Sequence, residues 1–222
     1  MRRARSREAK NERYDAILDA ALAMYERNPS FEAFTMAGLA GEVGLAKGTL
    51  YLYFRTKEAV FLGLLYDLFG AWFEDLDARL AQDADEWTPE QAAAELVDSM
   101  RGQETLLRLL SILPAIVEQN VELDVALHFK REVMAWAAAT GPLLEQRLPF
   151  LAAGQGARFL VHLHALVIGV WQLAEPSPVI RQVMERPELA PARVQFGPDL
   201  RRLVMLHLKG LREEASTNLE RG

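Results

Sequence analysis

Apolar residues recur at spacings of three and four along almost the whole chain, and this periodicity constrains the fold more than any other feature. Such spacing places apolar side chains on one face of an α-helix, whereas a half-buried strand alternates apolar and polar residues. No segment keeps a period of two for long, so no strand is expected. The sequence therefore predicts an all-α fold.

Four helices are expected in the N-terminal part, over residues 13–27, 36–43, 47–54 and 57–80. Thr35 is a suitable N-cap for the second of these helices, and Gly44 is suited to end it. Thr56 is expected to cap the fourth helix. The apolar stripe of this fourth helix continues for about six turns, which is long enough to join two parts of the protein rigidly.

The C-terminal part opens with Thr88-Pro89-Glu90-Gln91, in which Thr caps a helix, Pro occupies its first position and Gln stands three residues after the cap. Further helices are expected over about residues 103–120, 122–147, 155–174 and 198–215. Pro114 is expected to kink or break the first of them. Residues 175–198 contain five prolines and are interpreted as a linker with a short helix over residues 179–185.

The composition is that of a globular chain of 222 residues, 50% of them hydrophobic and 25% charged, without cysteine. The lack of cysteine excludes thiolate catalysis, iron–sulfur ligation and Cys-rich zinc sites. The basic N-terminus lacks the apolar segment of a secretory signal. The most apolar window, residues 159–173, is interrupted by polar residues and is expected to be too short to cross a membrane. Together these features predict a cytoplasmic protein without a membrane partner.

Charge is distributed unevenly along the chain. The net charge is −6 overall, but residues 1–60 carry a net charge of +2 and the remainder carries −8. The basic residues of the N-terminal arm are Arg2, Arg3, Arg5, Arg7, Lys10 and Arg13. Such an arm is either a solvated tail or a contact to a polyanion, and the sequence leaves both interpretations open.

Residues 36–53 have the spacing of two short helices packed steeply across a tight turn. Ala40 is small where the helices approach closely, and Gly44 allows the positive φ of the turn. The two helices are expected to pack against each other and against the preceding helix along an apolar interface, called the seam here. The residues expected to lie in this seam are Leu39, Val43, Leu45, Leu50 and Tyr53. The whole constellation favours a helix-turn-helix motif over a generic helical hairpin.

The second helix of this motif leaves several residues outside the seam, where they would meet the major groove of DNA. These residues are Ala46, Lys47, Gly48, Thr49, Tyr51 and Leu52. Lys47 can reach a phosphate or a guanine edge, and Thr49 offers a hydroxyl and a methyl group. Gly48 would allow the backbone to approach DNA closely, unless it only marks a frayed first turn. Tyr51 suits a phosphate oxygen, although it could instead pack on the neighbouring helix.

Residues 34–58, FTMAGLAGEVGLAKGTLYLYFRTKE, resemble the DNA-binding domain of the TetR family of transcriptional regulators. The resemblance covers about the first sixty residues. It implies a three-helix DNA-binding domain with its basic arm over residues 1–55. It also implies a larger helical domain over residues 56–222 that binds a small effector and dimerises.

The same resemblance implies which residues contact DNA. Phosphate contacts would come from Thr35, Tyr51, Tyr53 and Lys57, and base-edge contacts from Lys47, Gly48 and Thr49. Leu52 departs from the family pattern, which often has a polar or aromatic residue there, so its expected target is a thymine methyl. The operator sequence is therefore not implied.

The segment 155–174 is apolar on nearly all sides, which requires burial from more than one direction. Together with the leucine-rich helix expected over residues 198–215, it resembles the four-helix dimer interface of the family. A homodimer would hold its two helix-turn-helix motifs about 34–36 Å apart on DNA. The alternative is a central core helix in a monomer.

Neither a metal site, a cofactor nor a catalytic centre is expected. His162 and His164 are two residues apart and point to different sides of a helix, and His128 and His207 are isolated in the sequence. The sequence has no GxSxG motif, no phosphate-binding glycine loop and no clear carboxylate pair. A non-enzymatic protein is therefore expected.

A ligand cavity is expected between the helices of residues 89–174, lined mainly by apolar and aromatic side chains. Its candidate lining residues are Phe69, Met100, Leu110, Phe129, Met134, Trp136 and Trp171. Each of them could instead be ordinary core packing. The composition favours an apolar or aromatic ligand of modest size.

The leading hypothesis is a dimeric repressor that binds a roughly palindromic double-stranded operator and releases it when a small effector enters the second domain. One alternative is an activator or a constitutive DNA binder without a small effector. Another is a helical ligand-binding protein or catalyst with a vestigial helix-turn-helix. Salt separates these hypotheses, because binding of DNA through Lys47, Lys57 and the arm weakens steeply as salt rises, whereas an apolar ligand site responds much less.

Overall fold

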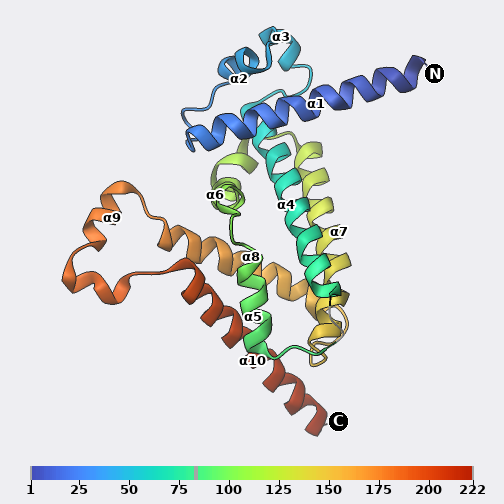
Figure 1. Cartoon of the computed structure of the whole chain (residues 1–222). Coiled ribbons are helices and arrows are strands. Elements are labelled where there is room, and N and C mark those ends of the chain that lie inside the picture. The colour runs from blue at the N-terminus through green and yellow to red at the C-terminus, as the bar shows by residue number, and fades with distance from the viewer. Residues whose placement is uncertain (1, 83–84, 222) are drawn as a thin grey trace. The chain divides into compact units, whose positions relative to one another are not determined.

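The computed structural model describes residues 2–82 and 85–221, and the side chains of residues 2–7, 116–118 and 219–221 lie outside that description. The helices, in chain order, are α1 (Arg2–Arg27), α2 (Met36–Val43), α3 (Lys47–Leu50), α4 (Lys57–Ala81), α5 (Pro89–Asp98), α6 (Glu104–Ile112), η1 (Leu113–Val117), η2 (Glu118–Asn120), α7 (Leu123–Arg147), α8 (Gln155–Ala174), α9 (Pro178–Met184), η3 (Pro187–Ala192) and α10 (Phe196–Arg221) (Figure 1). The described residues contain no strand. The all-α prediction is confirmed.

Two N-terminal helices differ from their predicted bounds. α1 begins at Arg2 rather than near Arg13, because its first turns consist of good helix formers that have no apolar stripe for a periodicity argument to detect. α3 ends at Leu50, four residues before the predicted end. Beyond Leu50 the chain forms a tighter turn, in which the Leu52 N–H donates to the carbonyl three residues earlier, that of Thr49, at 3.2 Å.

The capping box at Thr88 and the break at Pro114 are confirmed, whereas α10 runs from Phe196 to Arg221 and so extends beyond its predicted bounds of 198–215 at both ends. The Thr88 hydroxyl accepts a hydrogen bond from the Gln91 N–H, and the Gln91 side chain accepts one from the Thr88 N–H, which completes the capping box. α6 ends just before Pro114, and the chain continues through the π-helical turn η1 and the 3₁₀ turn η2. The proline-rich linker carries the short helix α9, one residue away from its predicted bounds at each end, and the 3₁₀ turn η3, which was not predicted.

The chain divides into two compact units, one formed by Met1–Leu68 with Ile112–Phe129 and the other by Phe69–Ser111 with Lys130–Gly222. The core of unit 1 is built around Phe61, whose ring has no exposed surface. Tyr25, Phe31 and Phe34 meet it edge-on, with ring centroids 5.3, 4.9 and 4.9 Å away. These edge-to-face pairs join α1, the connection between α1 and α2, and α4 around one aromatic centre.

In unit 2, α10 packs along α5 and α8 (Figure 1). α7 and α8 cross at two glycines, where a Cβ built on Gly156 would lie 2.2 Å from the Gly141 carbonyl oxygen. The Glu145 carboxylate accepts hydrogen bonds from the N–H groups of Gly154 and Gly156 at 2.8 and 2.9 Å. The carboxylate thus satisfies amide groups at the start of α8, while the glycines allow the two backbones to touch.

A buried arginine closes the end of α4. Arg147 is only 3% exposed, and its guanidinium donates to the Leu80 carbonyl oxygen from Nε at 2.8 Å and from a terminal nitrogen at 2.6 Å. It also donates to the Asp85 carbonyl at 3.0 Å and lies 5.5 Å from the ring of Trp87. The cation therefore supplies the partner that the Leu80 carbonyl, in the last turn of α4, lacks within the helix.

α8 is long and apolar enough to cross a membrane by length and composition alone. The expectation that the segment is too short considered only the window 159–173, whereas the whole helix Gln155–Ala174 has the length and composition of a membrane span. A core helix of a globular domain passes the same test. In unit 2, α8 packs against α10 and buries Phe159, Leu163 and Val167.

Candidate nucleic-acid interface and ligand cavity

The helix-turn-helix of unit 1 is fixed by local hydrogen bonds. The Thr35 hydroxyl caps α2 by accepting from the Gly38 N–H at 3.1 Å. Gly44 ends α2 in the left-handed conformation, with φ of 69°, and its N–H donates to the last carbonyls of that helix. Few residues other than glycine adopt this φ at low cost, so Gly44 sets the angle at which α3 leaves α2.

The seam of the motif is buried to different depths. Leu39, Ala40 and Leu50 are buried, with Leu39 and Leu50 fully enclosed. Val43 and Leu45 are half-buried. The buried Leu50 anchors α3 to the unit, so the residues around it are held on the outer side.

The residues predicted to meet the major groove lie on that outer side. Lys47, Gly48 and Thr49 are exposed, and Tyr51 and Leu52 are 39% and 79% exposed. The Lys47 ammonium lies 5.9 Å from the centroid of the Tyr51 ring. Unit 1 therefore presents a cation, two hydroxyls and one apolar side chain on a short, rigidly anchored segment.

Nothing in the described part of the chain explains why residue 48 is a glycine. A Cβ built at this position meets nothing within 4 Å, and its φ does not lie in the left-handed region. A glycine inside a helix costs about 1 kcal/mol relative to alanine. Packing in this chain therefore does not explain why the position lacks a side chain.

Three other predicted DNA contacts have partners within unit 1. The Lys57 ammonium donates to the Phe31 carbonyl at 2.9 Å and lies 4.0 Å from the centroid of the Phe31 ring. Thr35 is exposed but also serves as the cap of α2. Tyr53 is half-buried and lines a groove of unit 1. These side chains are partly committed to the fold, whereas Lys47 and Thr49 project from it.

The groove beside Tyr53 is acidic and aromatic. It is also lined by Tyr14, Phe54 and Asp67, and the rings of Tyr14 and Phe54 stack with centroids 4.8 Å apart. Burial raises the pKa of the Asp67 carboxyl, and the neighbouring charges of Asp15 and Asp19 raise it further. This acidic groove contrasts with the cationic start of α3.

The side chains of Arg2, Arg3, Arg5 and Arg7 lie outside the described residues. Lys10 is exposed on α1. Contact between the basic arm and a polyanion stays a prediction.

Unit 2 contains an apolar cavity of about 200 Å³. Four of the seven predicted lining residues meet there, namely Phe69, Met100, Leu110 and Met134. The cavity is also lined by residues that sequence reasoning did not assign to it, and these are Trp72, Phe73, Gln103, Leu106, Leu107, Lys130, Val133, Ala137, Leu160, Val161, Leu163, His164 and Val167. Trp72 and Phe73 share the apolar stripe of Phe69 on α4, so helical spacing from Phe69 could have identified them.

The other three candidates lie elsewhere. Phe129 belongs to unit 1 and lines the groove beside Tyr53. Trp136 packs behind the cavity wall, with its ring 3.0 Å from a Cβ built on Gly70. Trp171 meets Phe196 edge-on at 5.2 Å and lines a separate groove.

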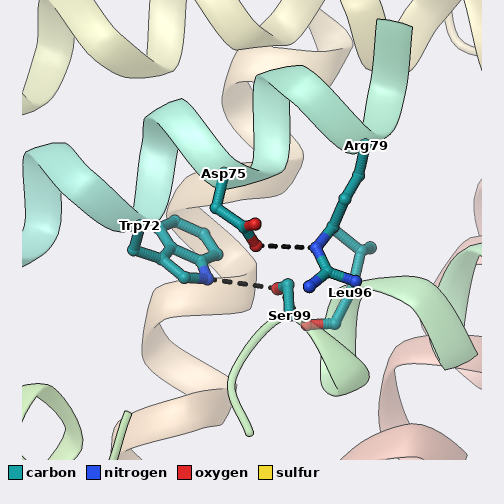
Figure 2. Close-up of polar contacts among 5 residues, drawn as sticks. All are labelled: Trp72, Asp75, Arg79, Leu96 and Ser99. Carbon is teal, nitrogen blue, oxygen red and sulfur yellow. Dashed lines mark hydrogen bonds and ion pairs between the residues drawn. The ribbon is translucent and has the colours of Figure 1, made fainter. Parts of the chain in front are cut away.

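Trp72, in the aromatic wall of the cavity, is held by a hydrogen bond to Ser99 (Figure 2). The Trp72 indole N–H donates to the Ser99 hydroxyl at 3.1 Å, and that hydroxyl donates to the Leu96 carbonyl at 2.8 Å. One turn along α4, Arg79 donates to Asp75 at 2.6 Å (Figure 2). Because its one donor is already used, Trp72 offers the cavity only carbon surface.

Residues 17–64 match the family described as "Bacterial regulatory proteins, tetR family", and residues 67–215 match "Tetracyclin repressor-like, C-terminal domain". The second match alone covers more than half of the chain. The chain belongs to the TetR family. Its helix-turn-helix is thus the DNA-binding element of a transcriptional regulator, and the family is not enzymatic.

Two curated relatives match parts of this TetR-family chain. The HTH-type transcriptional repressor KstR of Mycolicibacterium smegmatis is 40% identical over 72 residues, which is 32% of this chain and 33% of the relative. The Fatty acid metabolism regulator protein of Bacillus subtilis is 29% identical over 75 residues, which is 34% of this chain and 38% of the relative. The chain therefore aligns with only about a third of the length of these relatives.

Solved structures share the fold of the TetR-family chain. A TetR transcriptional regulator from Rhodococcus sp. RHA1 has a TM-score of 0.56 at 19% identity, covering 90% of this chain and 97% of that one. The regulator FadR from Bacillus subtilis, in complex with stearoyl-CoA, has a TM-score of 0.51 at 15% identity, covering 86% and 97%. At these identities the likeness shows the fold alone.

These matches confirm the regulator class that the sequence predicted, with DNA binding through the helix-turn-helix. The matches do not show which individual residues contact DNA or a ligand. The DNA-contacting residues, the ligand-binding residues, the split at residues 55/56 and dimerisation stay predictions.

His207, which is isolated in the sequence, has a neighbouring imidazole in the fold. Its Nε2 lies 3.0 Å from His162 Nδ1, so α10 and α8 are joined by an imidazole pair. Burial lowers the pKa of His207, and the neighbouring His162 lowers it further, against a smaller opposite effect of Glu214. Within the described residues, no three His, Asp or Glu side chains are grouped to hold a metal.

Proposed function

We propose that this TetR-family regulator is a dimeric repressor that binds a roughly palindromic operator and releases it when a small apolar or aromatic effector enters unit 2. The observation that carries the proposal is the exposed row Lys47, Gly48 and Thr49, held outward by the buried Leu50. A cytoplasmic location follows from this role and belongs to the proposal. The name of the relative KstR supports repression rather than activation.

The proposed DNA contacts divide into two kinds. Lys47 and Thr49 carry donors, an acceptor and a methyl group that suit base edges in the major groove, and Leu52 suits a thymine methyl. Thr35, Tyr51, Tyr53 and Lys57 would hold phosphates, which fixes the register of α3 in the groove. The open space around Gly48 supports a close approach of DNA to the backbone at that position.

The proposed dimer uses the exposed faces of α8 and α10. On α8, the exposed residues Val161, Ala165, Gly169 and Leu173 follow one another at intervals of four. On α10, Leu203, Leu206 and Gly210 are exposed. Large apolar side chains interrupted by small residues suit the close packing of one helix pair against its copy.

Release requires that the effector bind one conformer more tightly than the other. α4 contributes residues to both units, so a shift of this helix on effector binding is a direct route from the cavity to the reading head. A coupling free energy of about 1–3 kcal/mol would change operator affinity by about 5- to 150-fold. FadR, which shares the fold, is described in complex with stearoyl-CoA, and this supports effector binding in the second unit.

Selection of the purified protein against a random duplex library at physiological salt tests the operator. We expect a palindromic site whose half-sites are about one helical turn apart. Affinity for that site should fall steeply with salt. Failure to enrich any duplex would contradict specific DNA recognition and favour a vestigial helix-turn-helix.

Substitution at Gly169 tests the dimer. A Cβ built at Gly169 meets nothing within 4 Å in this chain, and the position is exposed, so Gly169→Arg should leave the monomer fold intact while blocking a helix–helix contact. Light scattering should show a dimer for the parent protein and a monomer for this variant. Ala139→Arg, at an exposed position of α7, is the matched control and should remain dimeric. A parent protein that is monomeric at micromolar concentration would contradict the proposal.

Titration of effectors into the protein–operator complex tests release. A molecule that binds unit 2 should raise the dissociation constant of the operator in proportion to its differential affinity. An operator affinity that no bound ligand changes would indicate a constitutive DNA binder.

A further inference from the structure

The cavity of unit 2 has a volume, an aromatic wall and a half-buried amide that together narrow the class of effector. We infer that the effector is a single aromatic ring with a short substituent, and that a neutral oxygen of this substituent bonds to the Gln103 amide. This inference rests on the proposed function, because it assumes that the cavity is the effector site.

The volume sets the size of the effector. The cavity encloses about 200 Å³. An apolar protein cavity of about 150 Å³ holds one benzene molecule, whereas pockets for drug-sized ligands have about 300–1,000 Å³. The effector is therefore about one ring with a short substituent, and a long acyl chain would not fit without rearrangement of the walls.

The wall favours an aromatic ring. Phe69, Trp72 and Phe73 line one side from successive turns of α4, with neighbouring centroids 4.8–5.6 Å apart. The Trp72 N–H is already bonded to Ser99, so Trp72 presents only its ring face and carbon edges (Figure 2). An aromatic ligand can extend this cluster in edge-to-face or offset contact, which contributes affinity beyond the burial of its area.

Gln103 supplies a polar partner at a fixed place. Its backbone N–H donates to the Met100 carbonyl at 3.2 Å, and its carbonyl accepts from the Leu107 N–H at 3.0 Å. The side chain is half-buried and lines the cavity, and its amide has no hydrogen-bond partner among the residues that the structure describes. A primary amide both donates and accepts, so it can bond to a hydroxyl or to a carbonyl oxygen of a ligand.

A neutral oxygen suits this lining better than a charged group. The lining is mostly apolar, and moving a charge out of water is costly unless an opposite charge offsets it. Lys130 and His164 also line the cavity, but each already has an interaction within the protein. The His164 ring lies 6.0 Å from that of Phe69, measured between centroids. Neither residue is therefore assigned to the effector.

Calorimetric titration of the full chain with small probes tests the ring and the size without DNA. The uncharged probes are benzyl alcohol, toluene, cyclohexylmethanol and 1-decanol. Each affinity is divided by the partition coefficient of the probe between octanol and water, which removes differences in hydrophobicity. On this scale benzyl alcohol should bind about fivefold more tightly than cyclohexylmethanol, because only the aromatic ring gains ring–ring contacts. The longer chain of 1-decanol should bind at least about tenfold more weakly than benzyl alcohol, since it exceeds the cavity.

A charged probe of the same size tests the neutral oxygen. Benzoate replaces the hydroxymethyl group of benzyl alcohol by a carboxylate. We expect benzoate to bind about tenfold more weakly than benzyl alcohol, because its charge loses hydration without a free opposite charge in the lining.

A variant assigns the polar contact to Gln103. Gln103→Leu removes the amide, so the ratio of the affinity for benzyl alcohol to that for toluene should fall about fivefold, as expected for one neutral hydrogen bond. Toluene forms no hydrogen bond and should still bind this variant, which shows that the cavity is intact. Gln182→Leu is the matched control and should keep the parent ratio, because Gln182 is exposed on α9 and does not line the cavity.

Several results would overturn the inference. Benzyl alcohol and toluene would fail to bind, or cyclohexylmethanol or 1-decanol would match benzyl alcohol on the octanol scale. Benzoate would bind as tightly as benzyl alcohol, or Gln103→Leu would keep the parent ratio of benzyl alcohol to toluene. Operator release is measured separately with the same probes. Binding of benzyl alcohol without release would support the ligand class and contradict the release mechanism, whereas release by ligands of another class would contradict only the inferred class.

Discussion

The reading head of unit 1 and the cavity of unit 2 contrast in how they are built. The reading head is a run of exposed residues between Ala46 and Leu52, anchored by a buried leucine and a glycine turn within the same motif. The cavity is lined from α4, α6, α7 and α8 and by residues that follow α5, over almost one hundred positions of sequence. One site is made by neighbours in sequence, and the other by the packing of distant helices.

The difference has consequences for mutation. Exposed residues of the reading head contribute little to packing, so their replacement changes DNA binding with little effect on stability. Residues that line the cavity also form the core, so a change there alters stability and effector binding together. The following expectations test this contrast, from the largest effect to the smallest.

Gly156→Ala should destabilise unit 2 most strongly. The added methyl would lie 2.2 Å from the backbone carbonyl of Gly141, and a backbone cannot move aside as a side chain does. We expect the free energy of unfolding to fall by about 3 kcal/mol, measured by urea denaturation. Gly197→Ala is the matched control, because a Cβ there meets nothing within 4 Å. Equal stability of the two variants would show that the helices can separate at low cost.

Lys47→Ala combined with Tyr51→Ala should weaken operator binding about 100-fold, since each contact to DNA contributes about 1–3 kcal/mol. Both side chains are exposed, so the unfolding midpoint should stay unchanged. Fluorescence anisotropy with the selected operator measures the affinity. Normal operator binding by the double variant would refute the assignment of α3 as the reading helix.

Gly48→Ala should raise the stability of unit 1 and lower its affinity for the operator. Alanine fits the open space and favours the helix by about 1 kcal/mol, so unit 1 should gain stability. Operator affinity should fall about tenfold if the backbone approaches DNA there, since each good contact to DNA contributes about 1–3 kcal/mol. Gly41→Ala is the control on α2, where a Cβ also meets open space. Unchanged affinity for Gly48→Ala would indicate only a frayed first turn.

Ala137→Leu should fill part of the cavity. Ala137 is 4% exposed and lines the cavity, so added methyl groups replace empty volume. Filling a cavity commonly raises stability by about 0.5–2 kcal/mol, and we expect about 1 kcal/mol together with weaker binding of any effector that occupies the cavity. Thermal unfolding and calorimetry measure the two effects. A loss of stability would mean that the walls do not accommodate a larger side chain.

The His162–His207 pair should give a small pH dependence to unit 2. Because the pKa of His207 is lowered in the folded state, the unfolded chain takes up the proton first as the pH falls through the ordinary His value of 6.5. Stability should therefore be complete above this pH and decrease below it. His207→Gln should flatten the dependence of the unfolding midpoint between pH 5 and 7, and an unchanged slope would assign it to other groups.

The sequence predicted most of the fold because its signals are local. The capping box of Thr88, the turn at Gly44 and the break at Pro114 each depend on a few adjacent residues. The main errors fall where local signals are silent. The first turns of α1 have no apolar stripe, and α3 ends at Leu50 although its apolar spacing continues to Phe54. The end of α4 was predicted to within one residue, but its closure by Arg147, 67 positions after the carbonyl partner Leu80, was not predicted.

The helices, the helix-turn-helix and its exposed residues could be predicted from the sequence, since helical periodicity and turn chemistry act over a few residues. The cavity could not be predicted in this way, because it forms only when distant helices pack together. The tertiary structure joined Phe69, Met100, Leu110 and Met134, placed Phe129 in unit 1, and put Trp136 and Trp171 elsewhere in unit 2. The physical reason is that apolar periodicity marks which face of a helix is buried but not which distant helix covers it.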